Sequence, residues 1–445
     1  MELKSLRELS QPDYQTREDD FFTEIYREED LKTLSDQLFS LLTITVRYQP
    51  FDTVIERIRQ SLPLMGFDMP NEGQQLHRDL SLQHLRLLEN VGERDVKEAL
   101  NSLEELPLND TSYYLKIIAP LILCHRVSNW ETYKWVALEI VNYAFENGKS
   151  EITAFGCLAL ARYMITRYED IRIAHEYAKF AITEIMKSDD DLFINNFHSD
   201  YAFTILPWIE KTDVCLQHIK DYFNYAERSN DNFSVNRDVK RYYQLLLFNG
   251  YNKEEALKLT FSELSEGKIE MFPQVEEVLD YFQLEKITER SNLEKVIMVI
   301  DSEPEMYEGN LLHPALLLLK AVQINNDHVQ DEGSLRKILD RFKYWAGYSP
   351  DIFNVWVAFV EAEWRYFKKE YTVAQGLYDK ALDFVNSNKN DLKCLIALRK
   401  LAVFYQAKDS GIDTKQLYQN TLNMYTSFGN TKAIETLKSR FQISE

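Results

Sequence analysis

Hydrophobic residues recur along this chain at the three- and four-residue spacing that places them on one side of an α-helix. The first clear case is a row of leucines: Leu31, Leu34, Leu38, Leu41 and Leu42. The next segment has the same spacing in Phe51, Ile55, Ile58 and Leu62. The stretch Pro63–Pro70 then contains two prolines and a glycine, which stop helices. We therefore predict two amphipathic helices that end before this stretch.

Beyond Glu72 the chain repeats one pattern, in which amphipathic stretches of roughly 12 to 20 residues alternate with short polar breaks. Helix starts are indicated by the capping-box spacing at Ser128–Glu131, Ser291–Glu294 and Ser302–Glu305, and by a cap before a first-turn proline at Ser349–Pro350. The breaks fall at Asn147–Gly148, Ser188–Asp191, Asn230–Asn232, Asn249–Gly250, Asn325–Asp331, Asn386–Asp391 and Gly429–Asn430. Short breaks of this kind predict helical hairpins.

The C-terminal third contains a repeated pattern of small and aromatic residues. Hairpins of the tetratricopeptide (TPR) type need a small residue where their two helices touch and aromatic residues around it. The repeat-packing positions are Leu398, Leu401, Ala402, Tyr405 and Tyr418 in one unit, and Ala362, Ala374, Tyr378 and Ala381 in the unit before it. Tyr378 and Tyr418 are 40 residues apart, so the units are longer than the standard length of about 34. We predict an all-α fold, an α-solenoid of degenerate TPR-like hairpins with about 18 to 22 helices.

The same patterns give the expected domain organisation. Residues 1–20 are polar and predict a flexible tail. Residues 21–90 form an N-terminal helical segment, and residues 91–445 form the TPR-like repeat array, continuous with the segment before it.

Composition supports the helical prediction. The chain has 13 glycines and 11 prolines, which is 24 of 445 residues or about 5%. The usual combined level is roughly 12%. So few turn-forming residues exclude a fold built from many tight hairpins but suit helices joined by short connections.

Charge restricts the class of partner. The chain has 51 basic and 71 acidic residues, a formal net charge of −20, and no basic stripe. Nucleic-acid binding is therefore disfavoured, as is docking on an anionic membrane. A basic protein or peptide suits this charge, although acidity also serves solubility alone.

Nothing in the sequence indicates export or membrane insertion. Residues 1–10 lack the apolar core of a signal peptide, and no stretch approaches the roughly 20 apolar residues of a membrane span. The cysteines Cys124, Cys157, Cys215 and Cys394 lie far apart, which is typical of reduced thiols. We expect a cytoplasmic protein.

Four segments resemble one known family. FDTVIERIRQSLPLMGFDMP (Phe51–Pro70) looks like the opening of the long TPR-like region found in large bacterial signalling ATPases, which combine a STAND-type NTPase with GAF and histidine-kinase modules. Trp356–Asn388, Leu395–Asn430 and Lys432–Phe441 resemble the repeats and terminal helix that close that region. The resemblance covers residues 35–441 and implies a helical arm that receives a partner or signal.

The catalytic modules of that family have no counterpart in this sequence. There is no G-x-x-x-x-G-K-[ST] phosphate-binding loop. Gly148, Lys149 and Ser150 match its last three positions, but Tyr143 stands where its first glycine belongs. The resemblance therefore implies a sensor or scaffold arm without ATPase or kinase activity.

Metal and nucleophile patterns are weak. Cys215 and His218 are one helical turn apart and His198 precedes them, but a structural zinc site needs four ligands at tight spacing. His77 and His84 are seven residues apart and suit an exposed helix face. Adjacent residues such as Cys124 and His125 point in different directions on a helix, and no partner for a cysteine nucleophile is evident. We expect no catalytic, cofactor or metal site.

Two aromatic clusters are candidates for binding a partner, because aromatic residues anchor protein interfaces. The candidate residues are Trp345, Trp356, Trp364, Tyr366, Lys368, Trp208, Tyr242 and Tyr243. Aromatic residues also fill helical cores, so both interpretations stay open here. We place a contact surface at Tyr366 and Lys368.

These observations favour a non-catalytic scaffold or sensor that binds a protein or peptide in the groove of a solenoid, in signalling or regulation. One alternative is a regulator that closes around a small molecule or peptide. A second is an (α/α)-toroid glycoside hydrolase with a carboxylate pair such as Glu361 and Glu363. Catalytic groups of such toroids stand on long, glycine-rich loops, whereas the breaks in this chain are short.

Overall fold

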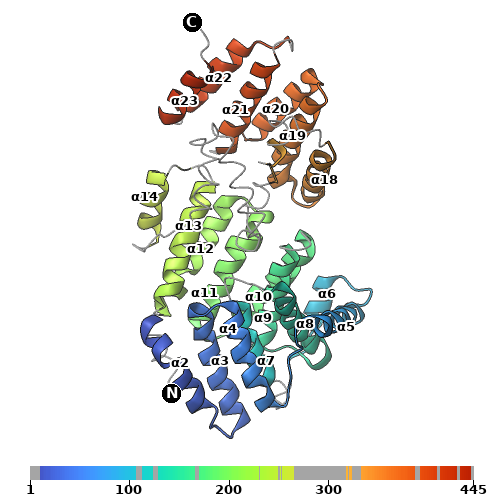
Figure 1. The fold of residues 1–445 in the computed structure, drawn as a ribbon, viewed down its shortest axis with the longest axis vertical. Coiled ribbons are helices and arrows are strands. Elements are labelled where there is room, and N and C mark those ends of the chain that lie inside the picture. The colour runs from blue at the N-terminus through green and yellow to red at the C-terminus, as the bar shows by residue number, and fades with distance from the viewer. Residues whose placement is uncertain are drawn as a thin grey trace. The chain divides into compact units, whose positions relative to one another are not determined.

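The computed structural model describes residues 11–106, 113–123, 129–165, 170–229, 231–248, 251, 253–264, 317–318, 320–322, 332–385, 391–407, 411–427 and 431–441. Within these ranges the chain is helical (Figure 1). Extended pairing among these residues is limited to one isolated bridge between Glu105 and Lys149. The predicted all-α class is confirmed. The predicted number of about 18 to 22 helices refers to the whole chain and stays a prediction.

The chain divides into two compact units. Unit 1 comprises residues 1–205 and 221–235, and unit 2 comprises residues 206–220 and 236–445. The division passes through two helices, α12 (Thr212–Arg228) and α13 (Asn232–Phe248). Unit 1 extends across the predicted boundary at residues 90 and 91.

The described elements of unit 1 are helices of 3-10, α and π type. Its remaining elements are α2 (Gln11–Ile25), α3 (Leu31–Tyr48), α4 (Phe51–Ser61), η1 (Leu62–Met65), α5 (Gln74–Val91), α6 (Val96–Asn101), α7 (Tyr113–Ile118), η3 (Ala119–Leu123), α8 (Trp130–Asn147), α9 (Glu151–Tyr163), α10 (Ile171–Ile185), α11 (Asp191–Asp200) and η5 (Tyr201–Ile205). Successive helices α8, α9, α10 and α11 pack on one another, while α5 packs on α8 and α3 on α7.

The two helices predicted from hydrophobic spacing form as expected. Helix α3 begins after Asp30, whose side chain caps the backbone N–H of Thr33 at 2.8 Å. Its leucines are buried except Leu31, which is 44% exposed. Helix α4 ends at Ser61, and the chain leaves it through Gly66, whose φ of 70° suits glycine.

The N-terminal tail requires a correction. We predicted a flexible tail over residues 1–20, but residues 11–20 belong to helix α2. The helix is held in place because Phe21 and Phe22 are buried, and because Arg57 of α4 pairs with Glu18 and Asp19. Residues 1–10 lie outside the described residues.

The Gly148–Ser150 segment is a turn between α8 and α9. Gly148 has a φ of 110°, and a Cβ there would lie 2.9 Å from the backbone of Leu106, so both conformation and space demand glycine. Lys149 pairs with residues 104–106 by backbone hydrogen bonds of 2.7 and 2.8 Å. Ser150 forms a capping box with Thr153 at the start of α9. The local likeness to a phosphate-binding loop therefore reflects the end of one helix, a turn and the start of the next helix.

The described part of unit 2 is also helical. Its elements beyond the shared helices are η6 (Leu206–Trp208), α14 (Lys253–Glu263), α18 (Glu332–Tyr348), α19 (Pro350–Phe367), α20 (Tyr371–Val385), α21 (Asp391–Gln406), α22 (Thr414–Ser427) and α23 (Thr431–Phe441). From α18 to α23 each helix packs against the next one along the chain.

Helix starts and breaks can be compared directly with the sequence. Ser349 and Pro350 begin α19 as predicted. Helix α8 is capped by the side chain of Asn129, which accepts from the backbone N–H of Thr132 at 3.0 Å, instead of by Ser128. The predicted starts at 291–294 and 302–305 lie outside the described residues, as does the break at 325–331. The breaks at 147–148, 188–191 and 230–232 separate described helices as expected.

None of the described helices combines the length and apolar character needed to cross a lipid bilayer.

Candidate functional site: buried polar networks between helices

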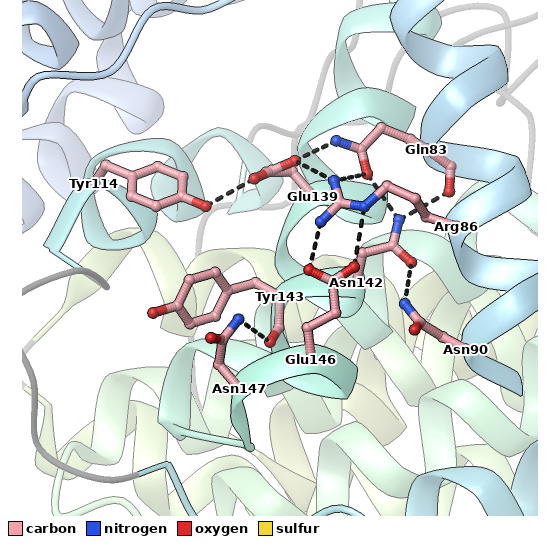
Figure 2. A network of polar contacts seen from close by, with 9 residues as sticks. All are labelled: Gln83, Arg86, Asn90, Tyr114, Glu139, Asn142, Tyr143, Glu146 and Asn147. Atoms are coloured by element: carbon pink, nitrogen blue, oxygen red, sulfur yellow. Dashed lines mark hydrogen bonds and ion pairs between the residues drawn. The ribbon is translucent and has the colours of Figure 1, made fainter.

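A row of polar residues runs along the contact between α5 and α8 in unit 1. Figure 2 shows these residues facing one another. We call the set the polar ladder; its members are Gln83, Arg86 and Asn90 of α5, Glu139, Asn142 and Glu146 of α8, and Tyr114 of α7. In each of the two longer helices the members are three and four residues apart, so they share one face.

Glu139 is the centre of the polar ladder and is only 7% exposed. Gln83 Nε2 donates to one carboxylate oxygen, and the Tyr114 hydroxyl donates to the other at 2.7 Å. The Arg86 guanidinium lies 3.6 Å from the oxygen that Gln83 contacts. Both carboxylate oxygens therefore have donors, as a buried charge requires.

The rest of the polar ladder is also hydrogen-bonded. Asn142 Nδ2 donates to the side-chain and backbone oxygens of Gln83 at 2.7 and 2.8 Å, and Asn142 Oδ1 accepts from Asn90 Nδ2 at 3.2 Å. Arg86 forms a two-pronged pair with Glu146, at 3.0 and 2.7 Å. Such paired contacts are directional, so they set the register of α5 on α8.

Tyr114 joins the polar ladder to an aromatic cluster. Its ring stacks on Phe67, with centroids 4.0 Å apart, and meets Tyr143 edge-on at 6.1 Å. Burial raises the pKa of the Tyr114 hydroxyl, and the adjacent Glu139 carboxylate raises it further. The hydroxyl therefore stays protonated and acts as a donor to Glu139.

Unit 2 contains a second buried carboxylate, in a group that we call the buried triad: Glu363 of α19, Tyr378 of α20 and Arg399 of α21. Arg399 donates to both oxygens of Glu363 at 2.7 and 2.9 Å, and the Tyr378 hydroxyl donates at 2.7 Å. Glu363 and Tyr378 have no exposed surface. Burial lowers the pKa of Arg399, but attraction to Glu363 outweighs it and the pKa is raised. The triad connects three successive helices.

Of the two buried carboxylates, Glu139 had a recognisable signal in the sequence. It interrupts the apolar run Trp135–Val141, whereas Glu363 lies beyond the run Val355–Val360 and next but one to Glu361. A lone carboxylate within an apolar run indicates a buried charge that needs a partner, so this rule could find Glu139 but could not separate Glu363 from Glu361. The partners, Gln83 and Arg399, could not be identified this way because they come from other helices.

Four of the predicted partner-binding residues are part of the interior. Trp208 and Trp345 are fully buried and meet edge-on with ring centroids 5.1 Å apart, and Tyr242 and Tyr243 are each 7% exposed. Their placement on a contact surface was wrong. The reason is that aromatic residues at helical spacing fill a core as readily as they form an interface.

The other four lie on α19 or directly after it and keep some exposure. Trp356 stacks on Phe342 with centroids 5.8 Å apart. The Trp364 indole donates to Glu332 at 3.3 Å, and the Lys368 ammonium lies 4.6 Å from its ring centroid. Lys368 also pairs with Glu332 at 2.7 Å. Tyr366 is half-buried, and burial raises its pKa.

The repeat-packing residues of the earlier unit, Ala362, Ala374, Tyr378 and Ala381, are all fully buried. In the later unit Leu401 is fully buried, whereas Tyr405 is 39% exposed and meets Phe441 edge-on at 5.2 Å. Tyr418 lies in α22 and is partly exposed. The side chains of Leu398 and Ala402 lie outside the described part of α21.

The histidine and cysteine candidates occupy separate environments. Cys215 is a buried free thiol whose pKa is raised by burial. His198 stacks on Tyr222 in unit 1 at 3.4 Å between centroids. His77 lies 3.1 Å from Glu131, and His84 is exposed. Among the described residues no group of three or more histidine, cysteine, aspartate or glutamate side chains is placed to hold a metal. Cys124 and His125 lie outside them.

No known protein family matches the chain in sequence, and no curated protein matches it either.

Proposed function

We propose that this protein is a non-catalytic scaffold or sensor that binds a protein or peptide segment on its helical hairpins. The observation that carries the proposal is the packing of α18 to α23, in which each helix contacts the next helix along the chain. Packing of each unit on the next unit along the chain is what a solenoid of TPR-like hairpins requires, and solenoids bind partners on the surface that the stacked helices leave open. A TPR-like solenoid is part of this proposal.

The proposed contact surface is the C-terminal end of α19, formed by Trp364, Tyr366 and Lys368. These side chains combine partly exposed aromatic area with charge, as binding anchors do. Lys368 is held by Glu332, and the neighbouring Arg365 pairs with Glu370 at 2.7 Å. Both cations are therefore already paired with glutamates. The net negative charge of the chain then favours a basic ligand.

The buried carboxylates support a non-catalytic role. Glu363, one member of the carboxylate pair that a glycosidase would use, is closed off by Arg399 and Tyr378. Glu361 lies on the same helix, 3.9 Å from Arg365. A catalytic acid must reach the glycosidic oxygen, and Glu363 has no exposed surface from which to do so.

The proposal includes the resemblance to the TPR-like arm of STAND-type signalling ATPases. In that family the arm receives a partner or a signal. A protein partner of this kind agrees with the binding mode proposed for α19.

The test is affinity capture from native lysate on the immobilised chain, with elution over a salt gradient. We expect a discrete protein to leave as salt rises, because screening weakens charge pairing. Trp364→Ala should reduce its recovery at least about tenfold, the effect of a hot-spot residue. Leu31→Ala, which truncates an exposed residue of unit 1, is the matched control and should retain the partner.

Circular dichroism of both variants separates lost binding from lost folding. An empty column would contradict the scaffold proposal. A captured protein whose recovery is unchanged by Trp364→Ala would contradict the proposed contact surface on α19.

A further inference from the structure

Helix α5 has one face that is exposed in the described part of the structure. Its packing contact is with α8, on the side of the polar ladder. The opposite side has three exposed leucines, Leu82, Leu85 and Leu88, which are 50%, 55% and 56% exposed. These are the most exposed leucines among the described residues, and they lie within two helical turns of one another. A cluster of this kind marks an interaction surface.

The spacing on this face is that of a helix–helix seam. Arg78, Leu82, Leu85 and Glu89 are separated by four, three and four residues, the a/d spacing of a coiled coil. We call these four residues the α5 stripe. Leu88 lies on one flank of it. Arg78 and Glu89 are exposed, and within the described residues neither has an ion-pair partner.

The α5 stripe is complementary to itself. When two copies of α5 lie antiparallel, Leu82 of each faces Leu85 of the other, and Arg78 of each faces Glu89 of the other. A parallel arrangement would instead place Arg78 against Arg78 and Glu89 against Glu89. Opposite charges at both ends therefore select the antiparallel arrangement and reject the parallel one. Self-matching of this kind is what a two-fold interface requires.

We propose that α5 is a dimerisation surface and that its partner is the α5 helix of a second copy of this chain. The seam covers about two turns on each side, which is smaller than a standard interface, so the dimer is weak and transient. Each copy has a net charge of −20, and this general repulsion opposes association. The test must therefore be run at physiological ionic strength, where distant charges are screened.

The first experiment is sedimentation of the full chain over a concentration series. We expect reversible dimers with a dissociation constant on the order of micromolar. Leu85→Glu should abolish association, because it places a carboxylate against the leucine of the partner. Leu31→Glu is the matched control: it changes another exposed leucine, 44% exposed, and should leave association unchanged.

The second experiment reverses the charges. Arg78→Glu and Glu89→Lys each place like charges together at both ends of the seam, and each should weaken association about tenfold. The double variant Arg78→Glu/Glu89→Lys restores opposite charges and should regain the wild-type affinity. Only an antiparallel pairing of this helix with itself predicts that recovery. Unchanged circular dichroism shows that the variants fold.

A wild-type chain that stays monomeric at all concentrations would overturn the proposal, and would leave the face to a different partner. A dimer that survives Leu85→Glu would place the interface elsewhere. Charge reversals that do not compensate each other would rule out the antiparallel register. None of these outcomes depends on the binding surface proposed for α19.

Discussion

Each unit buries a glutamate between helices, but the two units stabilise it differently. In unit 2, Glu363 is fully buried and depends on one buried cation, Arg399, together with the Tyr378 hydroxyl. In unit 1, Glu139 is 7% exposed and has neutral donors on both oxygens, with Arg86 at a longer distance. The Arg86 side chain is 37% exposed, against 7% for Arg399.

The difference shows how the cost of a buried charge can be concentrated or shared. A fully buried ion pair is vulnerable, because removal of one partner leaves an uncompensated charge in the interior. A network of amides and a hydroxyl shares the compensation among several groups. We therefore expect the buried triad to fail at one substitution and the polar ladder to weaken gradually.

The largest effect is expected for Arg399→Met, which leaves the Glu363 charge buried with Tyr378 as a remaining donor. The free energy of unfolding of unit 2 should fall by about 3–5 kcal/mol. Urea denaturation gives the loss, and hydrogen exchange in α19 to α21 assigns it to unit 2. In Glu363→Leu/Arg399→Met the charge is gone, and most of the stability should return. If the single variant lowered the free energy of unfolding by less than about 1 kcal/mol, Glu363 would not depend on Arg399 as the comparison holds.

Arg86→Met tests the shared network. Glu139 keeps its bonds from Gln83 and Tyr114, and Arg86 is 37% exposed, so the loss should be only about 0.5–1.5 kcal/mol, the range for an ordinary hydrogen bond. The same denaturation measurement applies, with hydrogen exchange followed in α5 and α8. A loss equal to that of Arg399→Met would mean that the neutral donors do not share the charge.

Two helical glycines, one beside the polar ladder and one in unit 2, differ in how closely other atoms surround them. Gly156 of α9 lies against α8, and a Cβ there would be 2.6 Å from Ile140 Cγ2, next to Glu139. Gly156→Ala should force α8 to move and cost about 1–3 kcal/mol in unfolding free energy. Gly376 of α20, near Tyr378, has open space around it.

Gly376→Ala is the matched control and should stabilise the protein by up to about 1 kcal/mol, because alanine favours the helix. Thermal unfolding measures both variants. Equal effects would show that the close approach of α8 and α9 does not constrain the polar ladder.

Alkaline pH should weaken both units. Burial, followed by the neighbouring glutamate, raises the pKa of Tyr114 and of Tyr378. The unfolded tyrosine ionises at about pH 10, so stability is complete below that pH and falls above it, by about 1.4 kcal/mol per pH unit for each residue. Urea midpoints on either side of pH 10 measure the slope. Tyr114→Phe and Tyr378→Phe should each reduce it, and an unchanged slope in both would contradict the shifts.

Local patterns were enough to predict much of the fold. The spacing in α3 and α4, the proline start of α19 and the breaks at 147–148 and 230–232 depend on residues within one or two helical turns. The tail was mispredicted because its polar sequence is held by a distant contact between Arg57 and Glu18. The role of Trp208 was mispredicted for a related reason, since its partner Trp345 is far away in sequence.

The sequence by itself determined the helical class, most helix boundaries that can be compared, and the acidic charge. These properties follow from propensity, periodicity and composition, which act over short distances along the chain. Only the tertiary structure decided which polar residues face each other, as Gln83 faces Glu139 and Arg399 faces Glu363. It also decided which aromatic residues are buried and which leucines of α5 are left uncovered. Such pairings depend on the packing of helices distant in sequence, and one helical period is compatible with many partners.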